Sequence, residues 1–412
     1  MKKHLFSAFL ALAAFQAFLA SPLSAERFRF RFAEGDSYRI NSIVQESVYV
    51  NRKLSHQAEI TSRITLDISD VREATEGESA SALNTCTFMT SERNTNRSFA
   101  WGREYPSVFR RDELGKMDIA PAYFMPVVRN VPSFPEGDVQ KGDTWTGTGE
   151  EAHDLRDSFG LDEPFKVPFT VTYIYMGKAT RDGKEYDLIR AEYSLVFNSP
   201  QPAGTAAASS RDYPVTTMGY SRQNLYWDNE RGVLQATEDE FRIQLQLASG
   251  TVLEFRGSAE MTVTEVKQLD RKTAVDAMNE EISRMGIADT KAEATDEGIT
   301  ISLENIQFEA DSARLLQSEK EKIIKIAAIL ERYPDKELLI TGHTALAGTA
   351  SSRQKLSEER AAAVARFLVE MGVRSEYNVY TRGFGAEKPV APNDTEANKS
   401  RNRRVEITIL EK

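Results

Sequence analysis

The chain has 412 residues, of which 41% are hydrophobic and 28% charged, and its formal net charge is −10. This length allows two or three domains that each bury a core, and the composition is that of an ordinary globular protein. The negative charge argues against a nucleic-acid partner, because the phosphates would repel such a surface.

Residues 1–25 have the pattern of a secretory signal peptide. Lys2 and Lys3 give a basic start, an apolar run extends from Leu5 to Leu19, and Leu23-Ser24-Ala25 suits cleavage. A helix needs about 20 apolar residues to span a bilayer, so we predict a cleaved signal rather than a membrane anchor. We therefore expect an exported protein of the periplasm or cell envelope, and leave open whether it associates with the outer membrane.

Residues 26–267 show the period-two alternation of β-strands. Apolar and polar side chains alternate in Arg27–Phe32, Arg63–Ile68 and Phe241–Leu247. Strands with one wet face predict a mainly antiparallel β region, packed as a sandwich or curled into a barrel-like sheet. We interpret Pro121–Pro135 and Ser199–Ser210 as long loops or as the boundary between two β subdomains.

Three details of this β region bear on function. The alternation also fits an outer-membrane barrel, but several strands are short and charged or proline-rich segments separate them, so we favour a soluble domain. For Arg27–Phe32 we predict an edge strand with a buried Phe face.

Cys86 is the single cysteine, so an internal disulfide is excluded, and we interpret this residue as buried and inert. The histidines are scattered and lack the spacing of metal ligands. We predict no metal and no cofactor.

The pattern changes to a helix between Asp270 and Met285, ended by Gly286. Its apolar side carries Ala274, Ala277, Met278 and Ile282. A charged passage, Asp289–Glu297, follows. We place a domain boundary here and interpret residues 268–295 as a helical linker between the β-rich domain and residues 296–412.

Residues 296–412 alternate between strands and helices. The predicted strands are Ile299–Leu303, Leu338–Thr341, Tyr377–Arg382 and Val405–Ile409. The first helix is capped by Asp311 or Ser312 and reaches Tyr333; the second has Ser351 and Gln354 at capping-box spacing and stops at Gly372. This order predicts an α+β fold, β-α-β-α-β, with a mixed sheet and its helices on one side.

Arg360 is the unusual residue of the second helix. Helical winding places it in the middle of an apolar arc made of Leu356, Ala363, Val364, Phe367, Leu368 and Met371. A guanidinium there is costly unless it is paired or opens onto a groove. Geometry alone favours neither an internal ion pair nor a ligand contact.

Five segments of this region resemble, in order and separation, the motifs of the OmpA-like peptidoglycan-binding family. They are Phe308–Ser312, Thr341–Thr344, Leu356–Ala361, Gly383–Gly385 with Pro389, and Asn402–Glu406. The resemblance covers about residues 296–412 and implies a groove for the peptide stem of peptidoglycan. It implies that Arg360 holds a carboxylate of diaminopimelate, for which a planar two-pronged donor is suited.

The resemblance also implies the other ligand contacts. The loop of Glu309, Ala310 and Asp311 would donate backbone groups, and Thr344 belongs to the second motif. Arg403 or Arg404 would line the groove from the last strand, depending on the phase of that strand.

Two positions depart from the family pattern. Ala345 stands where the family usually has an aspartate that pairs with the ligand's ammonium, and Arg353 stands where it usually has an asparagine. Loss of the aspartate would cost about 1.5–3 kcal/mol of binding. Three explanations stay open: a different cross-linking diamino acid, another anionic ligand, or a fold kept as a protein-interaction module. In the last case Arg360 would be structural.

No Ser or Cys motif with an oriented base is present, so we predict no enzymatic activity. We expect a cell-envelope protein whose OmpA-like domain contacts peptidoglycan and links the wall to an envelope or outer-membrane protein partner of the β domain. The alternative is a divergent OmpA-like protein without standard wall binding, which serves as an interaction or structural module. The sequence does not determine the oligomeric state.

Overall fold

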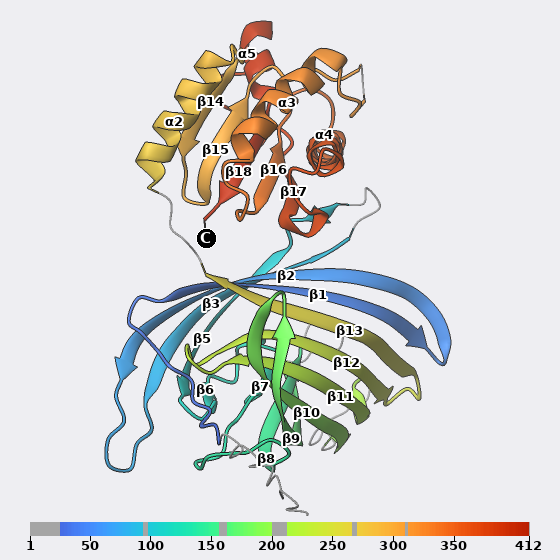
Figure 1. Ribbon diagram of the computed structural model, residues 1–412. Coiled ribbons are helices and arrows are strands. Elements are labelled where there is room, and N and C mark those ends of the chain that lie inside the picture. Colours follow the sequence, from blue (N-terminus) through green and yellow to red (C-terminus); the bar gives the residue numbers. More distant parts are fainter. Residues whose placement is uncertain are drawn as a thin grey trace, which may run out of the picture.

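The computed structural model describes residues 25–93, 98–155, 163–199, 212–265, 270–309 and 312–411. The predicted signal peptide up to Ser24 and nearly all of Ser199–Ser210 lie outside these residues. The described chain forms two sheets, one of twelve and one of six strands, shown in the lower and upper halves of Figure 1. None of its helices is both long and apolar enough to cross a membrane.

The N-terminal sheet is antiparallel throughout, in the order β6-β5-β3-β2-β1-β13-β12-β11-β10-β9-β8-β7. Its strands are β1 (Ser37–Val50), β2 (Lys53–Arg72), β3 (Ser81–Glu92), β5 (Arg103–Asp112), β6 (Met117–Ile119), β7 (Val128–Arg129), β8 (Thr144–His153), β9 (Phe165–Arg181), β10 (Lys184–Asn198), β11 (Pro214–Asp228), β12 (Val233–Leu247) and β13 (Val252–Glu265). The sheet curls strongly, and its two ends are linked because the Met117 N–H of β6 donates to Oδ1 of Asn130, the residue after β7, at 2.8 Å. The predicted antiparallel region is thus confirmed in its barrel-like form, and residues on both sides of Pro121–Pro135 contribute strands to one sheet.

Alternation along the strands determines what lies inside this sheet. In β9 and β10 nearly every second side chain is buried, and together with Phe28 and Trp227 these residues form one aromatic-rich core. Cys86 is 2% exposed, and burial raises the pKa of its thiol to about 12, so it is buried as predicted.

The segment Arg27–Phe32 is not the predicted edge strand. Its backbone donates to the turns at one end of the sheet, from Phe30 N to Glu113 O at 2.9 Å and from Arg31 N to Gly232 O at 3.1 Å. The segment therefore crosses the sheet end instead of extending an edge. The prediction of a buried Phe face is confirmed for Phe28 and Phe30, which are 1% and 8% exposed.

The C-terminal sheet has the order β14-β15-β18-β16-β17-β4, and only the β16–β17 and β17–β4 pairs are parallel. Its elements are β4 (Phe99–Ala100), α2 (Arg271–Arg284), β14 (Thr290–Ala294), β15 (Gly298–Leu303), α3 (Gln317–Leu330), β16 (Leu338–Gly342), α4 (Ala350–Glu370), the 3-10 helix η2 (Glu376–Asn378), β17 (Val379–Gly383), α5 (Glu396–Asn402) and β18 (Val405–Leu410). Helices α2, α3 and α4 cover one face of a mixed sheet (Figure 1), which confirms the predicted α+β fold.

Residues 268–295 contain more than the predicted helical linker. Helix α2 packs Ala274, Met278 and Ile282 into the same core as the C-terminal sheet, and β14 pairs with β15. Lys291 and Glu293 of the charged passage are exposed on this edge strand, and charged side chains protect a sheet edge.

Both long helices begin at other residues than the predicted caps. Ser312 Oγ accepts from Arg314 N at 2.9 Å and Phe308 forms an isolated β-bridge with Leu315, and α3 begins only at Gln317. Helix α4 is capped by Thr349, whose hydroxyl accepts from Ser352 N at 3.1 Å, instead of by Ser351.

The two sheets are joined by β4, which follows β3 in the chain but pairs with β17 (Figure 1). The Trp101 N–H donates to Thr381 O at 2.7 Å, and Met89 and Phe99 share a buried apolar cluster with Leu339, Tyr380 and Leu410.

Glu337 adds a buried ionic contact to this junction. Its carboxylate accepts from Arg63 Nε at 2.7 Å and from Arg39 Nη1, and the three side chains are at most 8% exposed. Both arginines come from the N-terminal sheet, from β1 and β2, so the contact crosses the junction.

Removing the shared carboxylate tests how much this junction stabilises the protein. We expect Glu337→Ala to lower the free energy of unfolding by about 3–5 kcal/mol, because two guanidinium groups stay buried without their carboxylate. Glu321→Ala, an exposed carboxylate of α3, is the control and should change it by less than about 0.5 kcal/mol. Equal urea-unfolding curves for the two variants would contradict this role.

Candidate functional site

Three of the five motifs meet at the ends of β16 and β17. Thr344 N donates to Gly385 O at 2.7 Å, His343 N to Arg404 O at 3.0 Å, and Phe384 N to Gly342 O at 3.1 Å. The loop after β16, the late glycine loop and the start of β18 are therefore fixed to one another by backbone hydrogen bonds.

Glycines bring α4 directly onto these strand ends. A Cβ at Gly342 would lie 2.0 Å from Ser357 O, and one at Gly383 would lie 2.5 Å from Ser357 Oγ. Ser357 is fully buried, and its hydroxyl accepts from Gly385 N at 2.9 Å. This close approach fixes α4 beside the loops and so positions Arg360, less than one turn further along.

The buried stripe of α4 differs from the predicted apolar arc. It consists of Ser357, Ala361, Ala362, Val364, Ala365 and Leu368, while Met371 is 36% exposed. Small side chains are buried because the helix backbone lies so close to the glycines of the sheet. Arg360 is therefore at the border of the stripe, partly buried, and not at its centre.

Arg360 reaches the first motif from this border. Its guanidinium carbon lies 4.7 Å from the centroid of the Phe308 ring, a cation–π distance. The contact joins the second-helix motif to the segment between β15 and α3. Of the predicted backbone donors in that segment, Glu309 is exposed, and Ala310 and Asp311 lie outside the described residues.

The two arginines before the last strand have different environments. Arg404 is 4% exposed, and it donates from Nε to Glu406 Oε1 at 2.8 Å and from Nη1 to Lys388 O at 3.0 Å. Arg403 is partly exposed and pairs with Glu396 at 2.7 Å. Of the two, Arg403 lies nearer to solvent.

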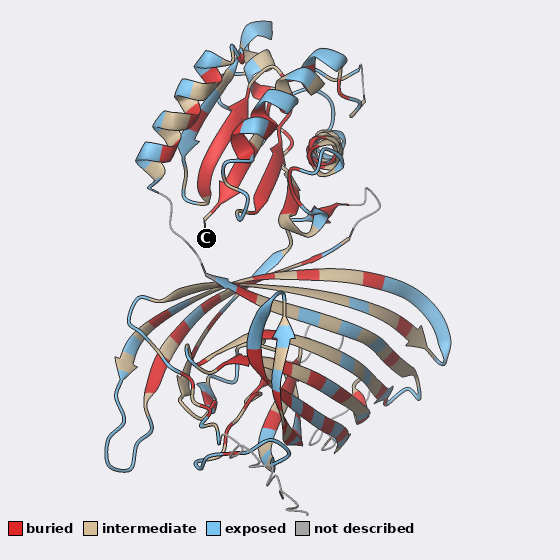
Figure 2. Ribbon diagram, viewed as in Figure 1, coloured by how far each residue is buried: buried red, intermediate tan, exposed pale blue. Residues whose placement is uncertain are grey.

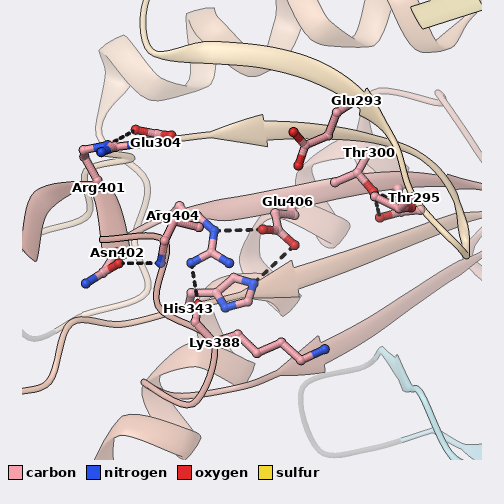
Figure 3. A network of polar contacts seen from close by, with 12 residues as sticks. Glu293, Thr295, Thr300, Glu304, His343, Lys388, Arg401, Asn402, Arg404 and Glu406 are labelled. Atoms are coloured by element: carbon pink, nitrogen blue, oxygen red, sulfur yellow. Dashed lines mark hydrogen bonds and ion pairs between the residues drawn. The ribbon is translucent and has the colours of Figure 1, made fainter. Parts of the chain in front are cut away.

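A polar network under the loops includes residues whose roles the sequence reasoning did not assign (Figure 3). His343 is 2% exposed, and its Nε2 lies 3.3 Å from Glu406 Oε2. Burial lowers the pKa of His343 below its usual 6.5, so the imidazole is neutral at pH 7. Burial alone would raise the pKa of Glu406, but its contacts with His343 and Arg404 lower that pKa to about 2.

Asn402 is another residue that sequence reasoning missed. Its Oδ1 accepts from Val390 N at 2.9 Å and Ala391 N at 3.0 Å, and its Nδ2 donates to Ala391 O at 2.8 Å and Asn393 Oδ1 at 3.1 Å. Asn393 Oδ1 also accepts from Leu346 N at 2.9 Å. Asn402 is the first residue of the last motif, and this position could have marked it as a candidate. Its hydrogen-bond partners lie in the loop around residues 390–393, and the motif does not identify that loop.

Of the two positions that depart from the family pattern, Ala345 lies on the loop that this network holds and Arg353 lies in the first turn of α4. Ala345 is 6% exposed, and the next residue is bound to Asn393. Arg353 bends back on the same loop, where its Nη1 donates to Gly348 O at 2.5 Å. The loop is therefore ordered without an aspartate at position 345.

Comparison with known proteins supports this assignment of motifs. The sequence profile of the OmpA family matches residues 307–403. Outer-membrane lipoprotein YfiB of Pseudomonas aeruginosa is 36% identical over 118 residues, which are 28% of this chain and 70% of that protein. Peptidoglycan-binding protein ArfA of Mycobacterium bovis is 36% identical over 104 residues, 25% of this chain and 32% of its own.

Among solved structures, the peptidoglycan-associated lipoprotein from Burkholderia pseudomallei is 30% identical, covering 26% of this chain and 87% of its own with a TM-score of 0.24. The chain spans only 16%, 48% and 30% of three further curated relatives. The matches with YfiB, ArfA and the Burkholderia lipoprotein each cover less than a third of the chain.

The His343 network predicts a pH dependence of stability. Because the pKa of His343 is lowered on folding, the unfolded chain binds more protons as pH falls below 6.5, and stability falls with it. We expect the free energy of unfolding to decrease from pH 7 toward pH 5 less in His343→Gln than in the original protein. Glu406 also stabilises the folded state, because its pKa is lowered on folding. That stabilisation is lost only at lower pH, between about 4.5 and about 2. Equal slopes in both proteins between pH 7 and 5 would contradict the prediction.

Proposed function

We propose that this chain, which belongs to the OmpA family, is a non-enzymatic protein of the cell envelope whose C-terminal domain contacts peptidoglycan. In this proposal the N-terminal sheet provides the link from the wall to a second envelope component. Two relatives support the proposal by name, since one is an outer-membrane lipoprotein and the other a peptidoglycan-binding protein.

The observation that carries the proposal is the position of Arg360 over Phe308. Stacking on a ring fixes the plane of a guanidinium, and a planar fork of donors recognises a carboxylate with two parallel hydrogen bonds. The peptide stem of peptidoglycan supplies such carboxylates. We propose Arg360 as the contact to the carboxylate of the diamino acid in the stem.

Three further groups complete the proposed contact surface. Thr344 Oγ1 is buried and has no hydrogen-bond partner among the described residues, so a ligand group that reached it would supply the missing hydrogen bond. Arg403 is partly exposed and adds a cation, whereas buried Arg404 acts through Glu406 to hold His343. The backbone around Glu309 would donate to the ligand from the segment next to Phe308.

The second candidate function, a protein-interaction module without wall affinity, is favoured by Ala345. An alanine cannot accept a hydrogen bond from an ammonium group, which would weaken binding of the usual stem about ten- to a hundredfold. Arg353 adds positive charge near the same loop. We place wall contact first because Arg360, Thr344 and the ordered loop are all present.

Co-sedimentation of the purified protein with peptidoglycan sacculi tests the first candidate. We expect the protein to pellet with sacculi, and Arg360→Ala to bind about ten- to a hundredfold more weakly because a charged hydrogen-bond donor is lost. Lys355→Ala, which removes an exposed cation of the same helix, is the matched control and should bind like the original protein.

Restoring the family residue separates the two candidates. If the original protein stays in the supernatant and only Ala345→Asp, alone or with Arg353→Asn, pellets, wall binding has been given up and the second candidate holds. If Arg360→Ala and Lys355→Ala pellet equally well, the carboxylate contact is contradicted. Circular dichroism of each variant shows whether it is folded.

A further inference from the structure

The N-terminal sheet encloses space on its concave side. Two adjoining cavities of about 210 Å³ and about 530 Å³ lie there. They share the wall residues Ile64, Phe88, Pro126, Val128, Val131, Leu234 and Met261. The larger cavity is in the size range of sites that bind small molecules, which are typically 300–1,000 Å³. Part of the Pro121–Pro135 segment forms a wall of both.

The walls of these cavities are apolar but not fully packed. Inward-facing side chains of β9 and β10 are buried in the aromatic core, whereas Phe241, Ile243, Phe255 and Met261 of β12 and β13 are only partly buried. Figure 2 shows this difference as red bands on the first pair and tan on the second. Apolar surface left open to water in this way is typical of a ligand site.

Arg111 gives the smaller cavity a positive charge. It continues the inward row of β5 after Phe109, and its guanidinium carbon lies 4.8 Å from the Phe30 ring and 5.3 Å from the Phe109 ring. Its Nη2 contacts Met117 Sδ at 3.5 Å, and its buried Nε has no hydrogen-bond partner among the described residues. Burial lowers its pKa, as expected for a cation in an apolar chamber.

The larger cavity has the opposite charge. Glu46, Glu151 and Asp239 are in its wall together with His153, whose Nε2 lies 3.0 Å from Glu151 Oε2, and the wall contains no Lys or Arg. Glu151 accepts from Tyr193 Oη at 2.7 Å and Asp239 from Ser221 Oγ at 2.7 Å, so these two carboxylates have partners on β10 and β11. An anionic group is repelled there, while the β12–β13 side of the cavity stays apolar.

We propose that the N-terminal sheet binds an amphiphile with one acyl chain and an anionic head group, the head paired with Arg111 and the chain lying along β12 and β13. The carboxylates of the larger cavity exclude the head from that end and so orient the ligand. This inference concerns the N-terminal sheet and the segments that line its concave side, and it does not depend on wall binding.

Calorimetric titration with single-chain probes tests the proposal on the whole protein, below the concentration at which the probes form micelles. We expect dodecanoate and dodecyl phosphate to bind and dodecyltrimethylammonium not to bind. Tighter binding of dodecanoate identifies a fatty acid as the ligand class, and tighter binding of dodecyl phosphate identifies a phosphate-headed lipid. If neither anion binds to the folded protein, the proposal is overturned.

Variants then test the two parts of the site. Arg111→Met should weaken both anions about ten- to a hundredfold, leave binding of the neutral dodecanol unchanged, and be partly rescued by Arg111→Lys. Arg190→Met, which replaces an exposed arginine of β10, is its control.

Ala259→Phe should block the larger cavity, whereas Ser258→Phe on the opposite face of β13 should not. Unchanged anion binding in Arg111→Met or in Ala259→Phe would overturn the assignment.

Discussion

Strand β4 lies in the chain between β3 and β5 of the N-terminal sheet but belongs to the C-terminal sheet by hydrogen bonding, and this pairing makes the two sheets one body. It covers the β17 edge, which would otherwise expose unpaired backbone groups. Around it, Glu337 accepts from arginines of β1 and β2, and Glu59 accepts from Tyr377 Oη at 2.7 Å. The concave side of the first sheet and the candidate wall site on the second are therefore held in a fixed relation.

Arg382 connects this junction to the candidate site. Its guanidinium carbon lies 5.6 Å from the Trp101 ring beside β4 and 4.8 Å from the Phe384 ring in the late glycine loop. Phe384 in turn stacks on His343 at 5.6 Å. The loops that present Thr344 and Arg403 thus pack against residues that the N-terminal sheet helps to order. A wall contact on one domain and an amphiphile in the other would give the envelope protein two attachments at a defined separation.

The sequence predicted the C-terminal fold well, because its signals are local. Alternation in Ile299–Leu303 and the stop at Gly372 depend only on neighbouring residues, and five motifs identified the family. The pairing of β4 with β17 and the network of Asn402 could not be predicted, since each joins residues far apart in the chain. In Arg27–Phe32 the alternation of apolar and polar residues correctly predicted the buried Phe face. It could not show that the backbone of this segment bonds to turns at the end of the sheet and not to an edge strand.

Hydrogen exchange of the Trp101 amide measures directly whether β4 is part of the C-terminal sheet. In the whole protein this N–H donates to Thr381 O at 2.7 Å across the junction. We expect the Trp101 amide to exchange about as slowly as the neighbouring amides of β17, and Glu337→Ala to speed its exchange. Exchange of the Trp101 amide at the rate of exposed amides, with β17 still protected, would show that the two sheets are independent bodies.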